Sequence, residues 1–311
     1  MSQKLTPVEK RLAENHVDII RNRATIQNAI FQHSVLCQTF MPYRNPGKDV
    51  RIWSQKQGNV SLAIQGSEIH NPKTGEYEFS GLPYGPKARL ILAHINSEAI
   101  RSQSPDIDVD RTLSGFMKRM DIHVNGYNIK QVKNQLRRIA ASTISLAYSD
   151  GHQGVQVNLM IVKMLNLWFP KDERQNVLWN SHIRLTDDYF NSLIDHAIPL
   201  DERALKALAH SAMGLDIYVW LAQRLHRVDP KQPVFLTWAA LKEQFGRGYN
   251  DMYKFKQIFR KTLKTVLLEY PQARIKEDKN KGFYLAHSPS PIGQKTIYHL
   301  GVDKPSAKPL K

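Results

Sequence analysis

The sequence predicts an α+β protein of two domains, each containing a helix, a turn, a basic helix and a two-stranded hairpin in that order. Its 311 residues exceed the usual size of one domain, and a hydrophobic content of 41% is ordinary for a globular protein. The formal net charge of +16 points to a polyanion or an acidic membrane surface as the partner. Both repeated segments are strongly basic, so the functional interpretation is based on them.

The first 84 residues are expected to form a helix followed by extended structure. Residues 5–31 have a loose apolar face and Pro7 in the first turn, so we expect a helix that packs across the first domain. Residues 36–84 have an extended pattern interrupted by NPKTG, a turn-rich string typical of a hairpin loop. Trp53 and Phe79 are the expected core anchors. The single cysteine, Cys37, excludes an internal disulfide and is expected to be a small buried hydrophobe.

The first basic helix follows a helix that begins near Pro86, a short strand in DIDVD and a helix in RTLSGFMKRMDI. After the turn HVNG comes YNIKQVKNQLRRIAAS, in which Ile129, Val132, Leu136 and Ile139 share one face. The opposite face consists of Tyr127, Lys130, Gln131, Asn134 and Arg138. Residues 111–142 hold 7 Lys and Arg against one Asp, and TISLAYSD and VQVNLMIVKML are the two expected strands.

The second basic helix lies between Trp238 and Ser288. MGLDIYVWLAQRLHRV is the expected core helix of the second domain, and the strand VFLT leads into a short helix that stops at Gly246 and Gly248. The longer helix that follows has an apolar stripe of Met252, Phe255, Phe259, Leu263 and Val266. Its other face carries Tyr253, Lys256, Gln257, Arg260, Lys261 and Lys264, and the tip of the hairpin that comes next carries Lys279 and Lys281. Residues 231–287 hold 12 Lys and Arg against 5 Asp and Glu.

Helix, turn, basic helix and hairpin in this order describe a winged helix-turn-helix, so the predicted fold is α+β with tandem winged-helix domains. In such a module the polar face of the second helix enters the major groove and the wing contacts the DNA backbone. A lone unit would equally fit a solvated amphipathic helix beside a hairpin, but two units in one chain favour DNA binding. The predicted domains are residues 1–170, which include the extra helix and hairpin, residues 171–288, and a mobile tail from 289 to 311.

Several strings in this order resemble the RepA-type plasmid replication initiators of Gram-negative bacteria, over about residues 80 to 288. They are GLPYGPKARLILAHINSEAIRSQ, RTLSGFMKRMDI, QLRRIAASTISL, IPLDERALKALAHSAMGLDIYVWLAQRL, TWAALKEQFGRGY and FKQIFRKTLKTVLLEYPQARI. The resemblance implies an initiator that binds repeated sequences, called iterons, in the double-stranded DNA of a plasmid origin. It also implies opening of an adjacent AT-rich segment and recruitment of host replication proteins, namely the host initiator and helicase. Such initiators commonly bind DNA as monomers and repress their own gene as homodimers.

Two recognition helices in one chain could occupy successive major grooves, which would let one monomer read a long repeat. We therefore expect the residues on both polar faces to contact base edges or adjacent phosphates. A dimer surface is expected around the hairpin within residues 36–84.

Other function classes fit the sequence less well. There is no GxxxxGK[ST] string for a phosphate loop and no His-x-His pair of the kind that a nicking enzyme needs, so we expect no catalytic residues, metal or cofactor. No stretch approaches the length of a membrane-spanning helix, and the N-terminus does not resemble a signal peptide, so a bacterial cytoplasmic protein is expected. Two alternatives stay open, a sequence-specific transcriptional repressor and a nonspecific basic DNA-binding protein.

Overall fold

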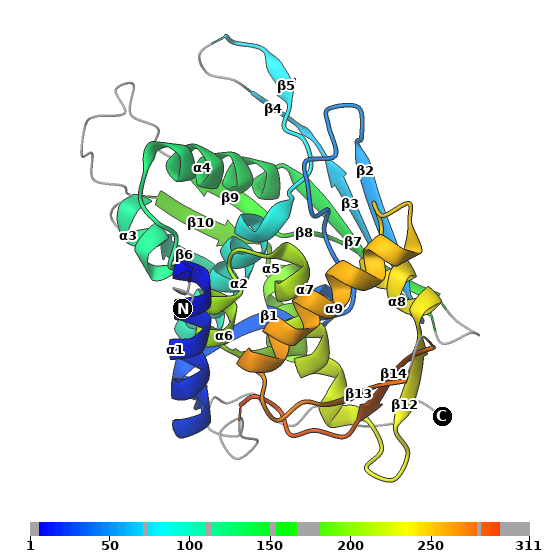
Figure 1. Ribbon diagram of the computed structural model, residues 1–311. Coiled ribbons are helices and arrows are strands. Elements are labelled where there is room, and N and C mark those ends of the chain that lie inside the picture. Colours follow the sequence, from blue (N-terminus) through cyan, green and yellow to red (C-terminus); the bar gives the residue numbers. More distant parts are fainter. Residues whose placement is uncertain are drawn as a thin grey trace. The chain divides into compact units, whose positions relative to one another are not determined.

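The computed structural model describes residues 6–70, 74–109, 113–149, 154–166, 181–278 and 281–292. Contacts divide the chain into two compact units. The first, which we call the split unit, combines Met1–Gln38 with Ile194–Lys311, and the second, the central unit, is Thr39–Leu193. In Figure 1 the blue N-terminal helix and the yellow to orange C-terminal elements therefore belong to one unit.

The split unit is closed by strand pairing between its two segments. Strand β1 (Ala29–His33) pairs antiparallel with β11 (Ala197–Asp201), with Phe31 opposite Pro199. Helix α1 (Pro7–Arg21) begins with a capping box between Thr6 and Glu9, and it contacts α6 (Glu202–Ala207) and α9 (Met252–Glu269). The helix expected to pack across the first domain packs instead against elements from the other end of the chain.

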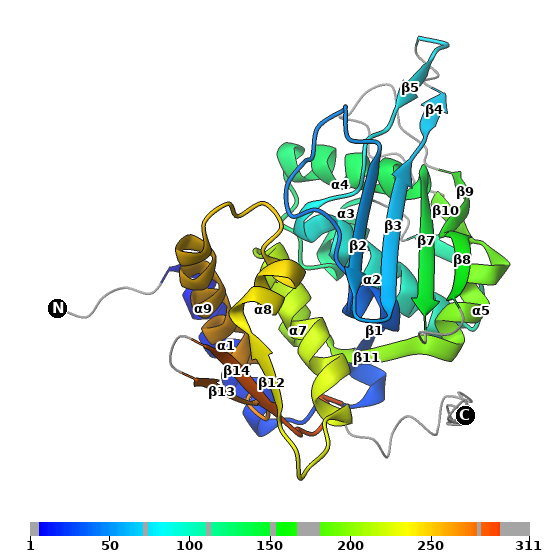
Figure 2. The same cartoon turned by 90° about the vertical axis from the view of Figure 1, so that its right-hand side faces the viewer.

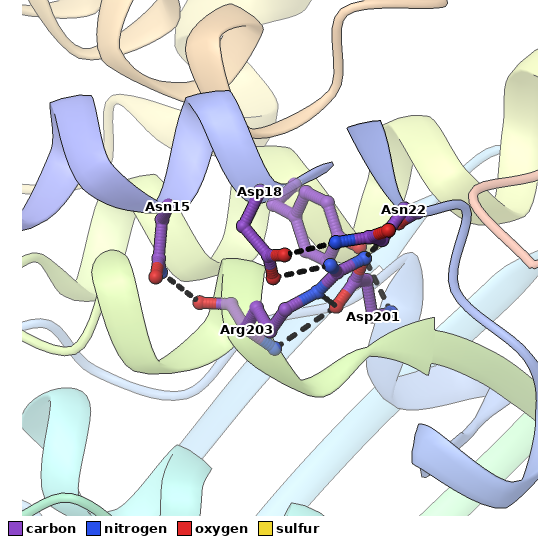
Figure 3. A network of polar contacts seen from close by, with 6 residues as sticks. Asn15, Asp18, Asn22, Asp201 and Arg203 are labelled. Carbon is purple, nitrogen blue, oxygen red and sulfur yellow. Dashed lines mark hydrogen bonds and ion pairs between the residues drawn. The ribbon is translucent and has the colours of Figure 1, made fainter. Parts of the chain in front are cut away.

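A polar network centred on Arg203 fastens α1 to α6 (Figure 3). The Arg203 guanidinium donates to Asp18 of α1 at 2.5 Å and to Asp201 at 2.8 Å, and it also donates to the carbonyl of Asn22 at 2.8 Å. Asn15 donates to the carbonyl oxygen of Arg203 at 2.8 Å. Only Leu12 and Ile19 of α1 are buried, so polar contacts are a large part of what holds this helix.

The core of the split unit is α7 (Ala212–Arg224), which is buried from Ala212 to Gln223 because apolar side chains cover nearly its whole circumference. The short helix η3 (Leu225–Arg227) extends it. The remaining elements are β12 (Val234–Thr237), α8 (Trp238–Phe245), α9, β13 (Arg274–Asp278) and β14 (Gly282–Ala286). The three strands form an antiparallel sheet in the order β12-β14-β13, and α8 and α9 lie beside it, as Figure 2 shows.

The central unit is built around α2 (Gly85–Ser102), a largely buried helix that contacts α4 (Gly126–Ala140). One four-stranded antiparallel sheet has the order β2-β3-β7-β8, and a second sheet has the order β6-β10-β9. The strands of the first sheet are β2 (Ile52–Gln57), β3 (Val60–Gly66), β7 (Ser142–Ser149) and β8 (Gly154–Met160). Those of the second are β6 (Asp106–Val109), β9 (Val162–Asn166) and β10 (Ser181–Leu185).

The smaller elements complete this unit and the connection to the split unit. Strands β4 (Glu68–His70) and β5 (Tyr77–Phe79) pair on either side of the predicted loop NPKTG, of which residues 71–73 lie outside the described residues. Helix α3 (Leu113–Arg119) precedes α4. Helix α5 (Asp187–His196) leads out of the unit, and η1 (Ile26–Asn28) and η2 (Ser34–Cys37) flank β1. No helix in the described part of the chain is long and apolar enough to cross a membrane.

Most elements expected from the sequence are present, with instructive differences. The strand predicted in VQVNLMIVKML breaks at Ile161, and its halves β8 and β9 pair in different sheets. Trp53 is half-buried and donates its indole N–H to the Phe40 carbonyl at 2.8 Å. Cys37 is fully buried, as expected, and burial raises the pKa of its thiol.

The contact division runs across the predicted ranges 1–170 and 171–288, because residues 1–38 join the C-terminal part of the chain. The functional assignment of those ranges stays a prediction. The expected boundary between residues 168 and 180 and the tail from residue 293 onward lie outside the described residues. Residues 289–292 of the predicted tail are described, and Ile292 is buried.

Candidate nucleic-acid interface

Side-chain caps and glycines set the ends of helices α8 and α9. The Thr237 hydroxyl accepts from the amide of Ala240 and caps α8, which ends at Phe245 with Gly246 as its C-cap. Gly248 has a φ of 101°, a conformation that a side chain would strain. The Asp251 carboxylate accepts from the amides of Tyr253 and Lys254 at the start of α9, and these bonds hold its pKa below the usual value. The glycine turn and the two caps fix where α9 begins.

One face of α9 is buried in an aromatic cluster. Trp238 lies at the centre, with ring centroids 6.2 Å from Phe255, 5.8 Å from Phe259 and 5.1 Å from Phe283. All four rings are at most 5% exposed, and the interplanar angles of 88°, 83° and 72° are the edge-to-face arrangement that aromatic quadrupoles favour. This packing fixes which side of α9 faces the sheet and therefore which side faces outward.

The outward face of α9 is polar and positive. Tyr253 is 76% exposed, the highest value among the large hydrophobic side chains of the described residues. The other exposed members of this face are Lys254, Gln257, Lys261 and Lys264. Of these, Lys254 was not among the residues predicted from the sequence; it follows Tyr253 directly, and its ammonium group lies 3.4 Å from the Gln257 side-chain oxygen.

Two predicted residues of this helix lie against the protein itself. Lys256 is half-buried, with its ammonium group 5.3 Å from the centre of the Trp238 ring, and the Arg260 guanidinium lies 4.8 Å from that ring. Arg260 also donates from Nε and Nη2 to one carboxylate oxygen of Glu277 on β13, at 2.8 and 2.6 Å. Arg260 therefore joins α9 to the β13–β14 hairpin.

The hairpin tip is described in part. Lys281 is exposed, and its carbonyl oxygen accepts from the amide of Trp238 at 3.2 Å, which ties the tip to the start of α8. Lys279 lies outside the described residues.

In the central unit, α4 begins at Asn125, whose side chain accepts from the amide of Asn128. The first turn presents Tyr127, which is 70% exposed, and Lys130 is also exposed. The Lys87 ammonium lies 5.7 Å from the centre of the Tyr127 ring, so a second cation stands beside this turn. Val132, Leu136 and Ile139 are buried, as expected for the inward face.

The later residues of the predicted α4 face are less accessible. Gln131, Asn134 and Arg138 are half-buried. The Arg138 guanidinium donates to Asn134 at 2.7 Å and to the Leu82 carbonyl at 2.8 Å, and it lies over the Tyr84 ring at 5.0 Å. Burial lowers the pKa of Arg138. Sequence periodicity placed this arginine on the polar face, but it cannot show that the loop of residues 82–84 packs there.

Exposure therefore separates the predicted residues into two groups. Tyr127, Lys130, Tyr253, Gln257 and the lysines at 261, 264 and 281 are exposed, whereas Gln131, Asn134, Arg138, Lys256 and Arg260 are partly covered by intramolecular contacts. Helix α9 thus presents an accessible basic face in the split unit, whereas α4 in the central unit exposes Tyr127 and Lys130 of its predicted face. No group of three or more His, Cys, Asp or Glu side chains among the described residues is arranged to hold a metal ion.

Similarities to known proteins concern the family and the fold of this chain. The family model described as "Plasmid encoded RepA protein" matches residues 82–239. Two solved structures match this chain: one titled "Crystal structure of SeMet derivatives of domain2 and domain 3 of RctB", with a TM-score of 0.51, and one titled "Crystal structure of the RctB domains 2-3, RctB-155-483", with a TM-score of 0.49. Each is 8% identical in sequence to this chain, and the matches cover 81% of this chain and 97% and 94% of the respective structures.

No protein in a search of curated sequences matches significantly. The first of the two structural likenesses shows a related mixed α and β fold. The family match extends over half of the sequence, from α2 through α4 of the central unit to α7 and the start of α8 in the split unit. The chain thus belongs to the family of plasmid-encoded RepA proteins, and this membership supports a role in the initiation of plasmid replication.

Proposed function

We propose that this protein initiates replication of a plasmid by binding repeated sites in the double-stranded DNA of the plasmid origin. The observation that supports the proposal is that α9 is amphipathic. One face is a buried aromatic stripe, and the opposite face exposes Tyr253, Gln257, Lys261 and Lys264. A helix with this division suits the major groove, where lysines neutralise phosphates and Gln or Tyr reach base edges. Family membership supports the same role.

In this proposal β12, α8, α9 and the β13–β14 hairpin act as one winged-helix module, and α3, α4 and the following strands act as a second. Each module places its helix in a major groove of one repeat, and the hairpin tip with Lys279 and Lys281 contacts the backbone. Because one chain carries both modules, binding of the first raises the effective concentration of the second.

The protein would then promote opening of the origin and recruit the host initiator and helicase in the bacterial cytoplasm. A homodimer would repress the protein's own gene, with a surface around the hairpin within residues 36–84. These steps follow from the resemblance to RepA-type initiators, and DNA binding is the step for which the geometry of α9 offers support.

The test is a comparison of affinities for origin duplex and random duplex of equal length at one physiological salt concentration. The full chain is expected to bind the origin roughly a thousandfold or more tightly than random DNA. Lys261→Gln and Lys264→Gln should weaken binding to both duplexes and each lower the salt slope by about one. Lys206→Gln on α6 is the matched control, because it removes the same charge outside the α9 face.

Equal affinity for origin and random duplex would reject the initiator proposal in favour of a nonspecific basic DNA-binding protein. A repressor without initiator activity would bind specifically but would fail to support replication of an origin plasmid in cells. Unchanged binding in both α9 lysine variants would remove α9 from the interface.

A further inference from the structure

Two exposed aromatic rings lie side by side on the outer face of the sheet β12-β14-β13. Phe235 of β12 and Tyr284 of β14 are directly opposite each other in the antiparallel register, with ring centroids 4.8 Å apart and planes at 48°. Phe235 is 36% exposed and Tyr284 is 42% exposed. Neither ring is needed to fill the core, because Trp238, Phe259 and Phe283 already do so on the other face.

The alternation of the strands explains why these rings face outward. On β14 the neighbours of Tyr284, Phe283 and Leu285, are buried, and the Phe283 ring lies 5.1 Å from Trp238 of α8. Successive side chains of a strand point to opposite faces, so Tyr284 and its partner Phe235 face away from α8 and α9. Figure 2 shows both helices on one side of this sheet.

Cations stand beside the aromatic pair. Lys276 of β13 is opposite Tyr284, so Phe235, Tyr284 and Lys276 form a row across the three strands. Arg274, two residues before Lys276, lies on the same face of its strand, and both are exposed. The exposed acid between Lys276 and Asp278 in sequence, Glu277, is bound to Arg260 on the helix side of the sheet. The outer face therefore combines two aromatic rings with two accessible positive charges and one half-buried acid, Asp278, which lies two residues after Lys276 on the same face of β13.

This combination suits unpaired nucleotides. In duplex DNA the faces of the bases are already stacked on each other, whereas a single strand exposes them to aromatic side chains. Stacking on a ring depends little on the identity of the base, and adjacent Lys and Arg side chains neutralise the phosphates. A flat sheet face with paired aromatics can seat neighbouring bases.

We propose that the outer face of the sheet β12-β14-β13 binds single-stranded DNA, with bases stacked on Phe235 and Tyr284 and phosphates paired with Lys276 and Arg274. This surface is separate from the outward face of α9, because the aromatic core lies between the sheet and that helix face. The inference goes beyond the proposed duplex binding and does not depend on it. A protein with both surfaces could hold duplex DNA with α9 and an unpaired strand with the sheet.

The test measures binding of the full chain to fluorescent oligo(dT) of about 15 nucleotides, within the range of known single-strand sites, by anisotropy at fixed salt. Phe235→Ala and Tyr284→Ala should each weaken binding by about fivefold or more. Tyr284→Phe keeps the ring and should bind like the unaltered protein. Ile20→Ala, which removes a 59% exposed apolar side chain of α1, is the control and should change nothing.

Two further measurements separate this surface from the duplex interface. Lys276→Gln should lower the salt slope of oligo(dT) binding by about 0.7, the value for one phosphate contact on a single strand. Affinity for origin duplex should be the same in all these variants, whatever its value. Circular dichroism and thermal melting verify folding, and Lys276→Gln keeps the proposal testable should an alanine variant unfold.

Several outcomes would overturn the proposal. Folded Phe235→Ala and Tyr284→Ala proteins that bind oligo(dT) normally would show that the rings do not stack on bases. A parallel loss of duplex binding would make the face part of the duplex interface. Tighter binding to oligo(U) than to oligo(dT) would identify RNA as the ligand. If light scattering shows self-association that Phe235→Ala abolishes while oligo(dT) binding is unchanged, the occupant is a second copy of the chain.

Discussion

Arg260 of α9 and Glu277 of β13 are joined by two hydrogen bonds to a single carboxylate oxygen, at 2.8 Å from Nε and 2.6 Å from Nη2. The Arg260 guanidinium also lies over the Trp238 ring, so this member of the ion pair contacts the aromatic cluster as well. An arginine engaged in this way cannot also give a bidentate contact to guanine through the same nitrogen atoms. DNA binding by Arg260 would require exchange of Glu277 for a base or a phosphate.

We therefore predict opposite effects for changes at the two ends of this pair. Glu277→Gln should free Arg260 and raise affinity for origin duplex by about threefold to tenfold, since it also removes a negative charge. Arg260→Ala should weaken origin binding more than random-duplex binding. Fluorescence anisotropy on both duplexes at one salt concentration measures these effects.

The double variant Arg260→Ala with Glu277→Gln provides the control. If Glu277→Gln acts by releasing Arg260, its gain should disappear in the double variant. A gain that persists without Arg260 would mean that only the removed charge matters. Equal losses on origin and random duplex in Arg260→Ala would reduce Arg260 to a phosphate contact.

Glu269 at the end of α9 predicts a pH-dependent stability of the split unit. It is 1% exposed, and neither carboxylate oxygen has a hydrogen-bond partner in the described structure. Burial, with a smaller contribution from the Asp201 charge, raises its pKa to about 8, whereas Arg11 and Arg203 lower it. The folded state holds a proton that the unfolded chain releases near pH 4.5, so stability should fall as pH rises from there to about 8.

Glu269→Gln should remove this dependence, because the amide keeps the shape without a charge. At pH 8 the variant is expected to be more stable by on the order of a few kcal/mol. Urea unfolding at pH 5.5 and pH 8 measures the change, with Glu243→Gln on the exposed side of α8 as the control. Parallel pH profiles for Glu269→Gln and the unaltered protein would show that Glu269 does not bind the proton.

The pairing of β6 with β10 predicts a second loss of stability with rising pH, centred on a histidine. His182 lies 2.9 Å from one Asp106 oxygen and 3.5 Å from Asp108, and these carboxylates raise its pKa, Asp106 most strongly. A raised histidine pKa contributes stability that is fully present below the ordinary value of 6.5. That contribution is lost as pH rises through the higher pKa of the folded state.

His182→Gln should therefore flatten the stability profile between pH 6 and pH 9, by a small amount because the pair is partly exposed and screened by water. Asp106→Asn should flatten it as well, since Asp106 is the main partner. Hydrogen exchange of the paired β6 and β10 amides at two pH values offers a local readout. A steeper profile in either variant would contradict the assignment.

Gly282 at the start of β14 has no room for a side chain, so we predict that substitution there destabilises the protein. A Cβ atom there would lie 1.9 Å from the Leu236 carbonyl oxygen of β12, well inside any allowed contact. Gly282→Ala should destabilise the split unit by more than about 2 kcal/mol, because backbone rather than a flexible side chain would have to move. Thermal melting checks this, with Gly126→Ala as control, since nothing lies within 4 Å of a Cβ at that position.

The sequence was sufficient for the local elements of both units. Period-3.6 stripes placed α4 and α9, glycines placed the turn after α8, and alternation placed β13 and β14, because each signal depends on a few neighbouring residues. The buried set of Phe255, Phe259, Leu263 and Val266 matches the predicted stripe. The same periodicity correctly separates exposed Tyr253 and Lys261 from the core, and their contact with DNA stays a prediction.

The tertiary structure decided what no local pattern encodes. Pairing of β1 with β11 and the Arg203 network join residues that are more than 160 positions apart, so α1 packs with the C-terminal elements. The contacts that cover Arg138 and Arg260 come from the Leu82 carbonyl and from Glu277, which are distant in sequence. Periodicity assigns a residue to a face of its own helix, but whether another segment covers that face is settled only when the chain has folded.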